Sequence, residues 1–112
     1  MSRGINKIIL VGHAGTDPEV RYTQAGDQVT TLNVATGKKW KDKQGNEQEA
    51  TEWHKCVLWS GLAKIAGQYV KKGQQVYLEG ELKTDKWTDK TGQKRYSTIV
   101  RCHELVMLGG KP

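Results

Sequence analysis

The feature that most constrains the fold is the order in which strand-like and helix-like hydrophobic patterns follow one another along the chain. Alternation with a period of two, which is typical of strands, runs through most of the sequence. It is interrupted once, at residues 61–69, where apolar side chains recur at the spacing of one helical face. The predicted helical face consists of Leu62, Ile65, Ala66 and Tyr69, and Ser60 is the predicted N-cap.

Five strands are predicted around this helix. They cover residues 5–13, 28–40, 49–60, 75–88 and 94–107, with a short extended piece through Val20 and Tyr22, and the first strand is expected to be largely buried. Three strands, a short helix and two more strands is the order of an OB-fold, an all-β, five-stranded Greek-key barrel with its helix between strands 3 and 4. Another small barrel or sandwich is the alternative. The 112 residues provide one small core, so a single domain over residues 1–112 is expected.

One seven-residue pattern occurs twice. Residues 39–45 and 86–92 both read Lys-Trp-x-Asp-Lys-x-Gly, which is typical of the turn at the end of a long β-hairpin. A Trp at an exposed tip is costly unless a flat, apolar group covers it, and the adjacent lysines favour an anionic one. Nucleobases on a phosphate backbone meet both demands. Packing of Trp40 and Trp87 on the protein body is the alternative.

The predicted third strand carries a second aromatic cluster. A period of two separates its side chains into two faces. Trp53, Lys55, Val57 and Trp59 share one face, and His54, Cys56 and Leu58 share the other. Two indoles flanking a lysine resemble a base-stacking platform with a phosphate contact. A core face with Lys55 extended to solvent is the alternative, but one small core has little room for four indoles.

The composition favours a polyanionic partner. Phe is absent although there are four Trp, and the net charge is +6. Fourteen of the 18 basic residues are Lys, which contacts phosphate as a mobile point charge and predicts binding without sequence preference. Cys56 and Cys102 form no CxxC, and neither they nor the three histidines have metal-site spacing. We therefore expect reduced thiols, no metal, no cofactor and a cytoplasmic protein without a membrane partner.

Four motifs carry a family resemblance. Residues 3–7, 17–22, 51–54 and 86–89 read Arg-Gly-Ile-Asn-Lys, Asp-Pro-Glu-Val-Arg-Tyr, Thr-Glu-Trp-His and Lys-Trp-Thr-Asp. In this order they resemble the DNA-binding domain of bacterial single-stranded DNA-binding proteins, over residues 2 to about 110. The resemblance implies an OB-fold, a homotetramer, and wrapping of single-stranded DNA during replication, repair and recombination.

The resemblance also implies roles for individual residues. The implied stacking residues are Trp40, Trp53, Trp59 and Trp87; the implied phosphate contacts are Arg3, Lys7, Arg21, Lys43, Lys55, Lys72 and Lys86; and the residues linked to subunit contacts are His54, Gln75 and Tyr77. Two departures matter. Ser60-Gly61 follow Trp59 where relatives commonly have Gly and then Lys, which removes one phosphate contact. Relatives also continue into a tail with an acidic tip, so replication and repair proteins are expected as partners only if the native protein carries such a tail.

Three other functions are open at this point. A single-stranded RNA-binding OB module would use the same rings and lysines, because only a 2′-OH contact separates the sugars. A small hydrolase or nuclease lacks support, since no nucleophile elbow or carboxylate cluster is evident and Glu79 and Glu81 are the only candidate pair. We therefore predict that the chain is not an enzyme and has no catalytic residues. A protein-interaction scaffold would leave four Trp without a nucleic-acid role.

Overall fold

The chain folds into a strand-rich structure with one short helix, and the computed structural model describes residues 3–109. In chain order the elements are β1 (Ile8–Ala14), β2 (Glu19–Tyr22), β3 (Gln28–Lys41), β4 (Glu47–Trp59), α1 (Ser60–Tyr69), β5 (Gln75–Thr88) and β6 (Lys94–Leu108). All five predicted strands are present. The first begins three residues later than predicted, and the bounds of the others agree within two residues.

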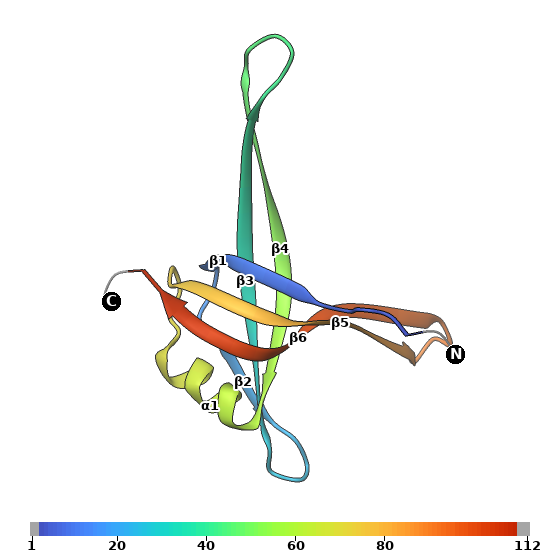
Figure 1. The fold of residues 1–112 in the computed structure, drawn as a ribbon. Helices are drawn as coiled ribbons and strands as arrows, with labels where there is room; N and C mark the ends of the chain where they lie inside the picture. The colour runs from blue at the N-terminus through green and yellow to red at the C-terminus, as the bar shows by residue number, and fades with distance from the viewer. Residues whose placement is uncertain (1–2, 110–112) are drawn as a thin grey trace.

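Five of the strands close into a barrel (Figure 1). Their hydrogen-bonded order is β1-β5-β6-β4-β3, and pairing of β1 with β3 at His13↔Ala35 completes the ring. β4 and β6 meet in parallel at Cys56↔Val100, whereas the other pairs are antiparallel. β2 is a four-residue strand paired with β3, so α1 connects the third and fourth barrel strands. The predicted OB-fold is confirmed.

The barrel interior is filled by aliphatic side chains and small residues. Its largest fully buried side chains are Leu32, Leu58, Leu78, Val34, Val70 and Val76. β1 was predicted to be largely buried, and this is wrong. Only its inward face, with Leu10 and Ala14, lies in the core, whereas Ile9 and Val11 on the outer face are exposed.

Helix α1 covers one end of the barrel with a face that matches the predicted one in part, since Ala66 is buried and Leu62 packs against the core as predicted. Ala63, Ala66 and Val70 are buried, whereas Ile65 and Tyr69 are exposed. The small alanines allow the helix to approach β3 closely, where the Thr30 hydroxyl donates to the Ala63 carbonyl at 2.7 Å. The predicted Ser60 N-cap is also wrong. The cap position is Trp59, no side chain caps the helix, and Ser60 has φ of 53°.

Two long hairpins extend beyond the barrel (Figure 1). We call them the β3–β4 arm and the β5–β6 arm. Their ladders continue to Lys41↔Glu47 and Thr88↔Lys94, directly before the two repeated turns. The radius of gyration is 16.6 Å, compared with about 13 Å expected for a compact chain of this length. The arms therefore add surface that a barrel alone would not provide.

Candidate nucleic-acid interface

All four tryptophans lie on the surface. Trp40 is 44% exposed, Trp53 61%, Trp59 41% and Trp87 49%. They extend from three strands, β3, β4 and β5, whereas the described core contains no aromatic side chain. The alternative in which the indoles of β4 fill the core is therefore wrong. Each ring has surface available to a stacking partner.

The outer wall of β4 matches the predicted alternation. Trp53, Lys55 and Trp59 are exposed, whereas Cys56 and Leu58 on the opposite face are buried. Val57 is also buried although it shares the outer face. The two indoles are thus separated along the strand by the exposed Lys55 and the buried Val57.

The Trp53 ring packs directly against Gly15. A Cβ placed on Gly15 would lie 2.5 Å from Cη2 of Trp53 and closer still to Cζ3. The indole therefore rests directly on the backbone of the loop that follows β1. Because any larger residue would displace the ring, Gly15 determines the position of the Trp53 indole.

Arg101 belongs to the same surface, although sequence reasoning did not include it. It lies on β6 opposite Val57 of β4, and its guanidinium carbon is 5.9 Å from the centroid of the Trp59 ring. This distance is within the range of a cation–π contact. The contact depends on the parallel β4–β6 pairing, which local sequence patterns do not reveal.

The β3–β4 hairpin carries indoles on both of its faces, Trp40 on the arm and Trp53 at the barrel wall. Trp40 pairs with Gln48, on the face that continues from the barrel interior, whereas Trp53 pairs with Ala35 on the outer face. The Lys38 ammonium nitrogen is 5.7 Å from the centroid of the Trp40 ring.

The two arms end in the same turn, as the repeated sequence predicts. Asp42 Oδ1 accepts hydrogen bonds from the backbone N–H groups two and four residues further on, and Asp89 Oδ1 does the same. Gly45 and Gly92 adopt φ of 82° and 85°, a region that favours glycine. These turns hold the tips rigidly beside Trp40 and Trp87.

Hydrogen bonding at the turns also perturbs the two carboxyl groups. The Thr91 hydroxyl, the Arg95 guanidinium and the turn amides lower the pKa of Asp89 to about 2. Backbone amides, first that of Asn46, likewise lower the pKa of Asp42. Both carboxylates are therefore satisfied within their turns and leave the neighbouring lysines available to an anion.

The predicted phosphate contacts fall into two groups. Arg3, Lys43, Lys55, Lys72 and Lys86 are exposed. Arg21 and Lys7 are exposed as well, but each forms an ion pair with a carboxylate. The Arg21 guanidinium is 2.6 Å from Glu19 on β2, and Lys7 Nζ is 3.2 Å from Glu79 Oε1 on the outer face of β5. Lys43, Lys55 and Lys86 lie on the arms and the β4 wall, close in the chain to the indoles, whereas Lys7, Arg21 and Lys72 lie elsewhere.

The three residues that were linked to subunit contacts lie on two different strands, β4 and β5. Gln75 and Tyr77 are half-buried on β5, where the Tyr77 hydroxyl donates to Glu79 Oε2 at 2.9 Å. This hydrogen bond and the Lys7 ion pair lower the pKa of Glu79. His54 lies on β4, and its Nε2 is 2.9 Å from the Thr36 hydroxyl. Glu79 is thus engaged by its neighbours rather than free as one of a carboxylate pair.

The described residues contain no metal-binding site that would suggest another function. Cys56 and Cys102 are buried free thiols on neighbouring strands of the core, and their mutual contact together with burial raises the pKa of Cys56. Over residues 3–109, no group of His, Cys, Asp and Glu is arranged to hold a metal ion. In the same range, no helix is long and apolar enough to cross a membrane.

Comparison with known proteins decides the family. The model of the Single-strand binding protein family matches residues 5–108, nearly the whole chain. The chain belongs to this family. The single-stranded DNA-binding protein 1 of Chlorobaculum tepidum is 52% identical over 112 residues, and the chain covers 69% of its length. The single-stranded DNA-binding protein of Xanthomonas campestris pv. campestris is 52% identical over 111 residues. The chain spans 64% of the length of that protein, which is less than two thirds.

Solved structures agree with this family assignment. The chain resembles the Plasmodium falciparum SSB in its complex with ssDNA, with a TM-score of 0.87 and 29% identity over 97% of this chain and 99% of that one. A mutant of the Thermus aquaticus single-stranded DNA-binding protein matches with a TM-score of 0.84 and 32% identity, over 99% of this chain and 54% of that one. The names of these family members describe binding rather than catalysis, in agreement with the prediction that the chain is not an enzyme.

Proposed function

We propose that this chain binds single-stranded DNA without sequence preference, by stacking bases on exposed indoles and by contacting phosphates through lysines and arginines. One observation carries the proposal: all four tryptophans are 41–61% exposed, on two arms and a barrel wall rich in basic side chains. Membership of the Single-strand binding protein family supports the same ligand.

The mechanism is selective capture of the unpaired state. Bases in a duplex already stack on each other, so their faces are not available to Trp40, Trp53, Trp59 and Trp87. Bases of a single strand are free to stack, and each such contact contributes about 1–3 kcal/mol. Lysines add a sequence-independent attraction that weakens as salt increases. Preference for the single strand therefore follows without recognition of base edges.

Capture of this kind accounts for a role in replication, repair and recombination. A strand held on the two arms and the barrel cannot form hairpins, and its backbone is shielded from nucleases. We propose that residues 1–112 act as one such binding domain, because the described hydrophobic core is a single cluster. A cytoplasmic, nucleoid-associated location is a prediction that follows from the ligand. Recruitment of replication and repair proteins would require an acidic tail in the native protein.

Three ligands of equal length test the proposal: labelled oligo-dT, oligo-U and duplex DNA, compared by fluorescence anisotropy at two salt concentrations. We expect tight binding of oligo-dT, much weaker binding of the duplex, and affinity that falls with salt. Equal or tighter binding of oligo-U would favour the single-stranded RNA-binding alternative. Binding of the duplex as tightly as oligo-dT would contradict base stacking as the source of affinity.

We also propose that the chain forms a homotetramer through the outer face of β1, β5 and β6. Val11, Tyr77 and Val106 are cross-strand neighbours there, and Ile9 lies two residues from Val11 on the same face. Ile9, Val11 and Val106 are exposed, which a subunit interface would relieve. Tethering four sites would also raise avidity. Light scattering on Val11→Glu, with Val20→Glu on β2 as an exposed-valine control outside the proposed interface, tests this. We expect a tetramer for the parent and dissociation only for Val11→Glu, whereas a monomeric parent would refute the proposal.

A further inference from the structure

The β5–β6 arm has two chemically different faces, which the strand register separates. Leu82, Thr84, Lys86 and Thr88 lie opposite Val100, Thr98, Tyr96 and Lys94 on the face that continues from the barrel interior. Glu81, Lys83, Asp85 and Trp87 lie opposite Arg101, Ile99, Ser97 and Arg95 on the other face. We call the first one the inner face of the arm, because it ends in buried Val100.

Charge is distributed unequally between the two faces. The described residues of the inner face include two lysines and no carboxylate, whereas Glu81 and Asp85 lie on the opposite face. The nearby Asp89 carboxylate in the turn already accepts hydrogen bonds from the Thr91 hydroxyl and the Arg95 guanidinium. The positive charge of Lys86 and Lys94 is therefore not balanced locally, so this surface favours an anion.

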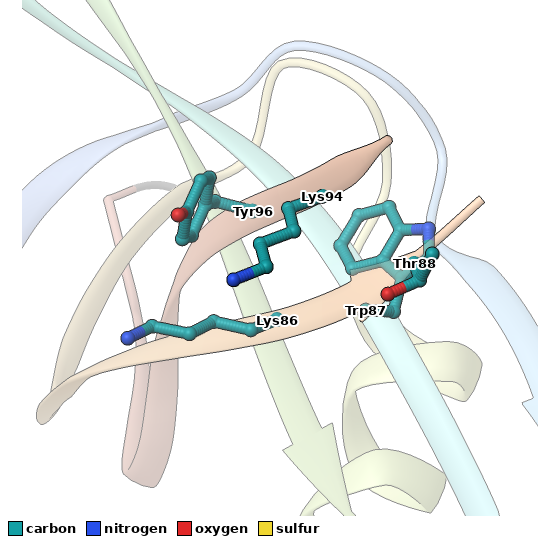
Figure 2. Close-up of a pocket in the computed structure, with 5 residues that line it drawn as sticks. All are labelled: Lys86, Trp87, Thr88, Lys94 and Tyr96. Carbon is teal, nitrogen blue, oxygen red and sulfur yellow. The ribbon is translucent and has the colours of Figure 1, made fainter. Parts of the chain in front are cut away.

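A cavity of about 280 Å³ opens on this arm, lined by Lys86, Trp87, Thr88, Lys94 and Tyr96. Figure 2 shows that the two lysines and Tyr96 come from the facing strands, with Trp87 and Thr88 at one end. Tyr96 is 62% exposed. The volume lies just below the range of pockets that enclose a whole drug-sized ligand, and it suits one unit of a longer molecule.

The arrangement around Tyr96 repeats that around Trp40. Lys86 Nζ is 5.8 Å from the centroid of the Tyr96 ring, and Lys38 Nζ is 5.7 Å from that of Trp40. Both rings lie on the arm face that continues from the barrel interior. Each arm thus presents an aromatic ring with a lysine beside it on its inner face.

We propose that the Tyr96 pocket is a nucleotide subsite, in which a base stacks on Tyr96 and its phosphate lies between Lys86 and Lys94. This inference rests on the proposed binding of single-stranded DNA and adds a fifth aromatic platform to the four tryptophans. The ring supplies a flat apolar surface, and the two ammonium groups supply the charge that a nucleotide requires. A bound strand then passes around the edge of the β5–β6 arm and contacts both of its faces.

Two measurements on the whole chain test the subsite. Oligo-dT that carries 5-iododeoxyuridine is irradiated on the parent protein, and the cross-linked residues are mapped by mass spectrometry. Binding of unmodified oligo-dT is then compared between the parent, Tyr96→Ala, Tyr96→Phe and Tyr69→Ala. Tyr69 is the matched control, because it is an exposed tyrosine on α1, away from the arms.

We expect a cross-link at Tyr96 and a dissociation constant at least five-fold higher for Tyr96→Ala, the lower bound of a lost base-stacking contact. Tyr96→Phe keeps the ring and Tyr69→Ala lies outside the site, so both stay within two-fold of the parent. Lys94→Gln lowers the slope of log affinity against log salt by about 0.7, the effect of one phosphate contact on a single strand.

Two results overturn the inference, and they can be distinguished. If the parent binds oligo-dT and Trp53→Ala weakens it, but Tyr96 gives no cross-link and Tyr96→Ala binds like the parent, the subsite is refuted while the proposed function stands. If the parent binds no oligo-dT at all, both the subsite and the proposed function are refuted. The cross-link is measured on the parent protein, so the conclusion does not depend on how well a variant folds.

Discussion

Replacement of Gly15 by alanine tests whether the position of the Trp53 ring, and not only its presence, determines affinity. The added Cβ would lie 2.5 Å from Cη2 of Trp53, about 1 Å nearer than an ordinary carbon contact. The ring must therefore move. Because Trp53 is 61% exposed, the indole can swing into solvent, so we expect little change in the free energy of unfolding.

The cost is expected in binding instead. A ring that is no longer held in place must be ordered when the base arrives, and it no longer shares a surface with Lys55 and Trp59. The loss cannot exceed the stacking contribution of Trp53 itself, about 1–3 kcal/mol or roughly 5- to 150-fold in the dissociation constant. We predict that Gly15→Ala weakens oligo-dT binding by about five-fold, and that Trp53→Ala sets the upper limit.

A double-mutant cycle with Gly15→Ala and Trp53→Ala, measured by anisotropy with short oligo-dT, isolates this effect. Gly37→Ala is the matched control, since a Cβ on Gly37 meets nothing within 4 Å and the residue lies on the same arm. We expect Gly15→Ala to have no further effect once Trp53 is alanine. Equal losses from Gly15→Ala in the presence and absence of the indole would refute the reasoning.

Three further predictions follow from the site and the fold. Arg101→Gln should lower the slope of log affinity against log salt by about 0.7, whereas Arg101→Lys should preserve the slope; an unchanged slope for Arg101→Gln would place Arg101 outside the interface. Gly80→Ala should lower the free energy of unfolding in urea by about 1–3 kcal/mol, because the new Cβ would lie 2.8 Å from the Arg101 carbonyl carbon and 2.9 Å from Cys102 Cα; parent-like stability would show that this strand pair can yield. An NMR titration of the Gln93 amide should report the Asp89 pKa at about 2. Since an unfolded Asp titrates near 3.9, the turn is stabilised by this carboxylate above that pH and loses the contribution as pH falls toward 2; a midpoint near 4 would contradict the turn geometry.

Sequence patterns predicted those parts of the fold that depend on neighbouring residues. The period of two located the strands, including both ends of β5, and the repeated turn predicted two equivalent tips because Asp and Gly stand at fixed offsets. The helix face was predicted only in part, for a physical reason. Size and hydrophobicity favoured Ile65 and Tyr69, but close approach of α1 to β3 requires small residues, so Ala63 is buried beside the correctly predicted Ala66.

The parts of the site that escaped prediction depend on pairing between distant segments. Arg101 meets Trp59 through the parallel contact of β4 and β6, and Gly15 meets Trp53 through the loop after β1. Tyr96 joins Lys86 only in the register of the β5–β6 arm. The first two pairs of neighbours cannot be read from local spacing. A cross-strand alignment of the predicted arm would have placed Tyr96 beside Lys86, since the turn fixes the hairpin register.

The central claim is that the exposed indoles stack on unpaired bases, and intrinsic tryptophan fluorescence tests it most directly. The protein is titrated with long oligo-dT at low and high salt, with duplex DNA of the same length as control. We predict strong quenching by the single strand, saturation at a salt-dependent number of nucleotides, and little change with the duplex. Binding of oligo-dT without quenching would contradict the account, because the four indoles would then make no contact with the bases and charge alone would hold the strand.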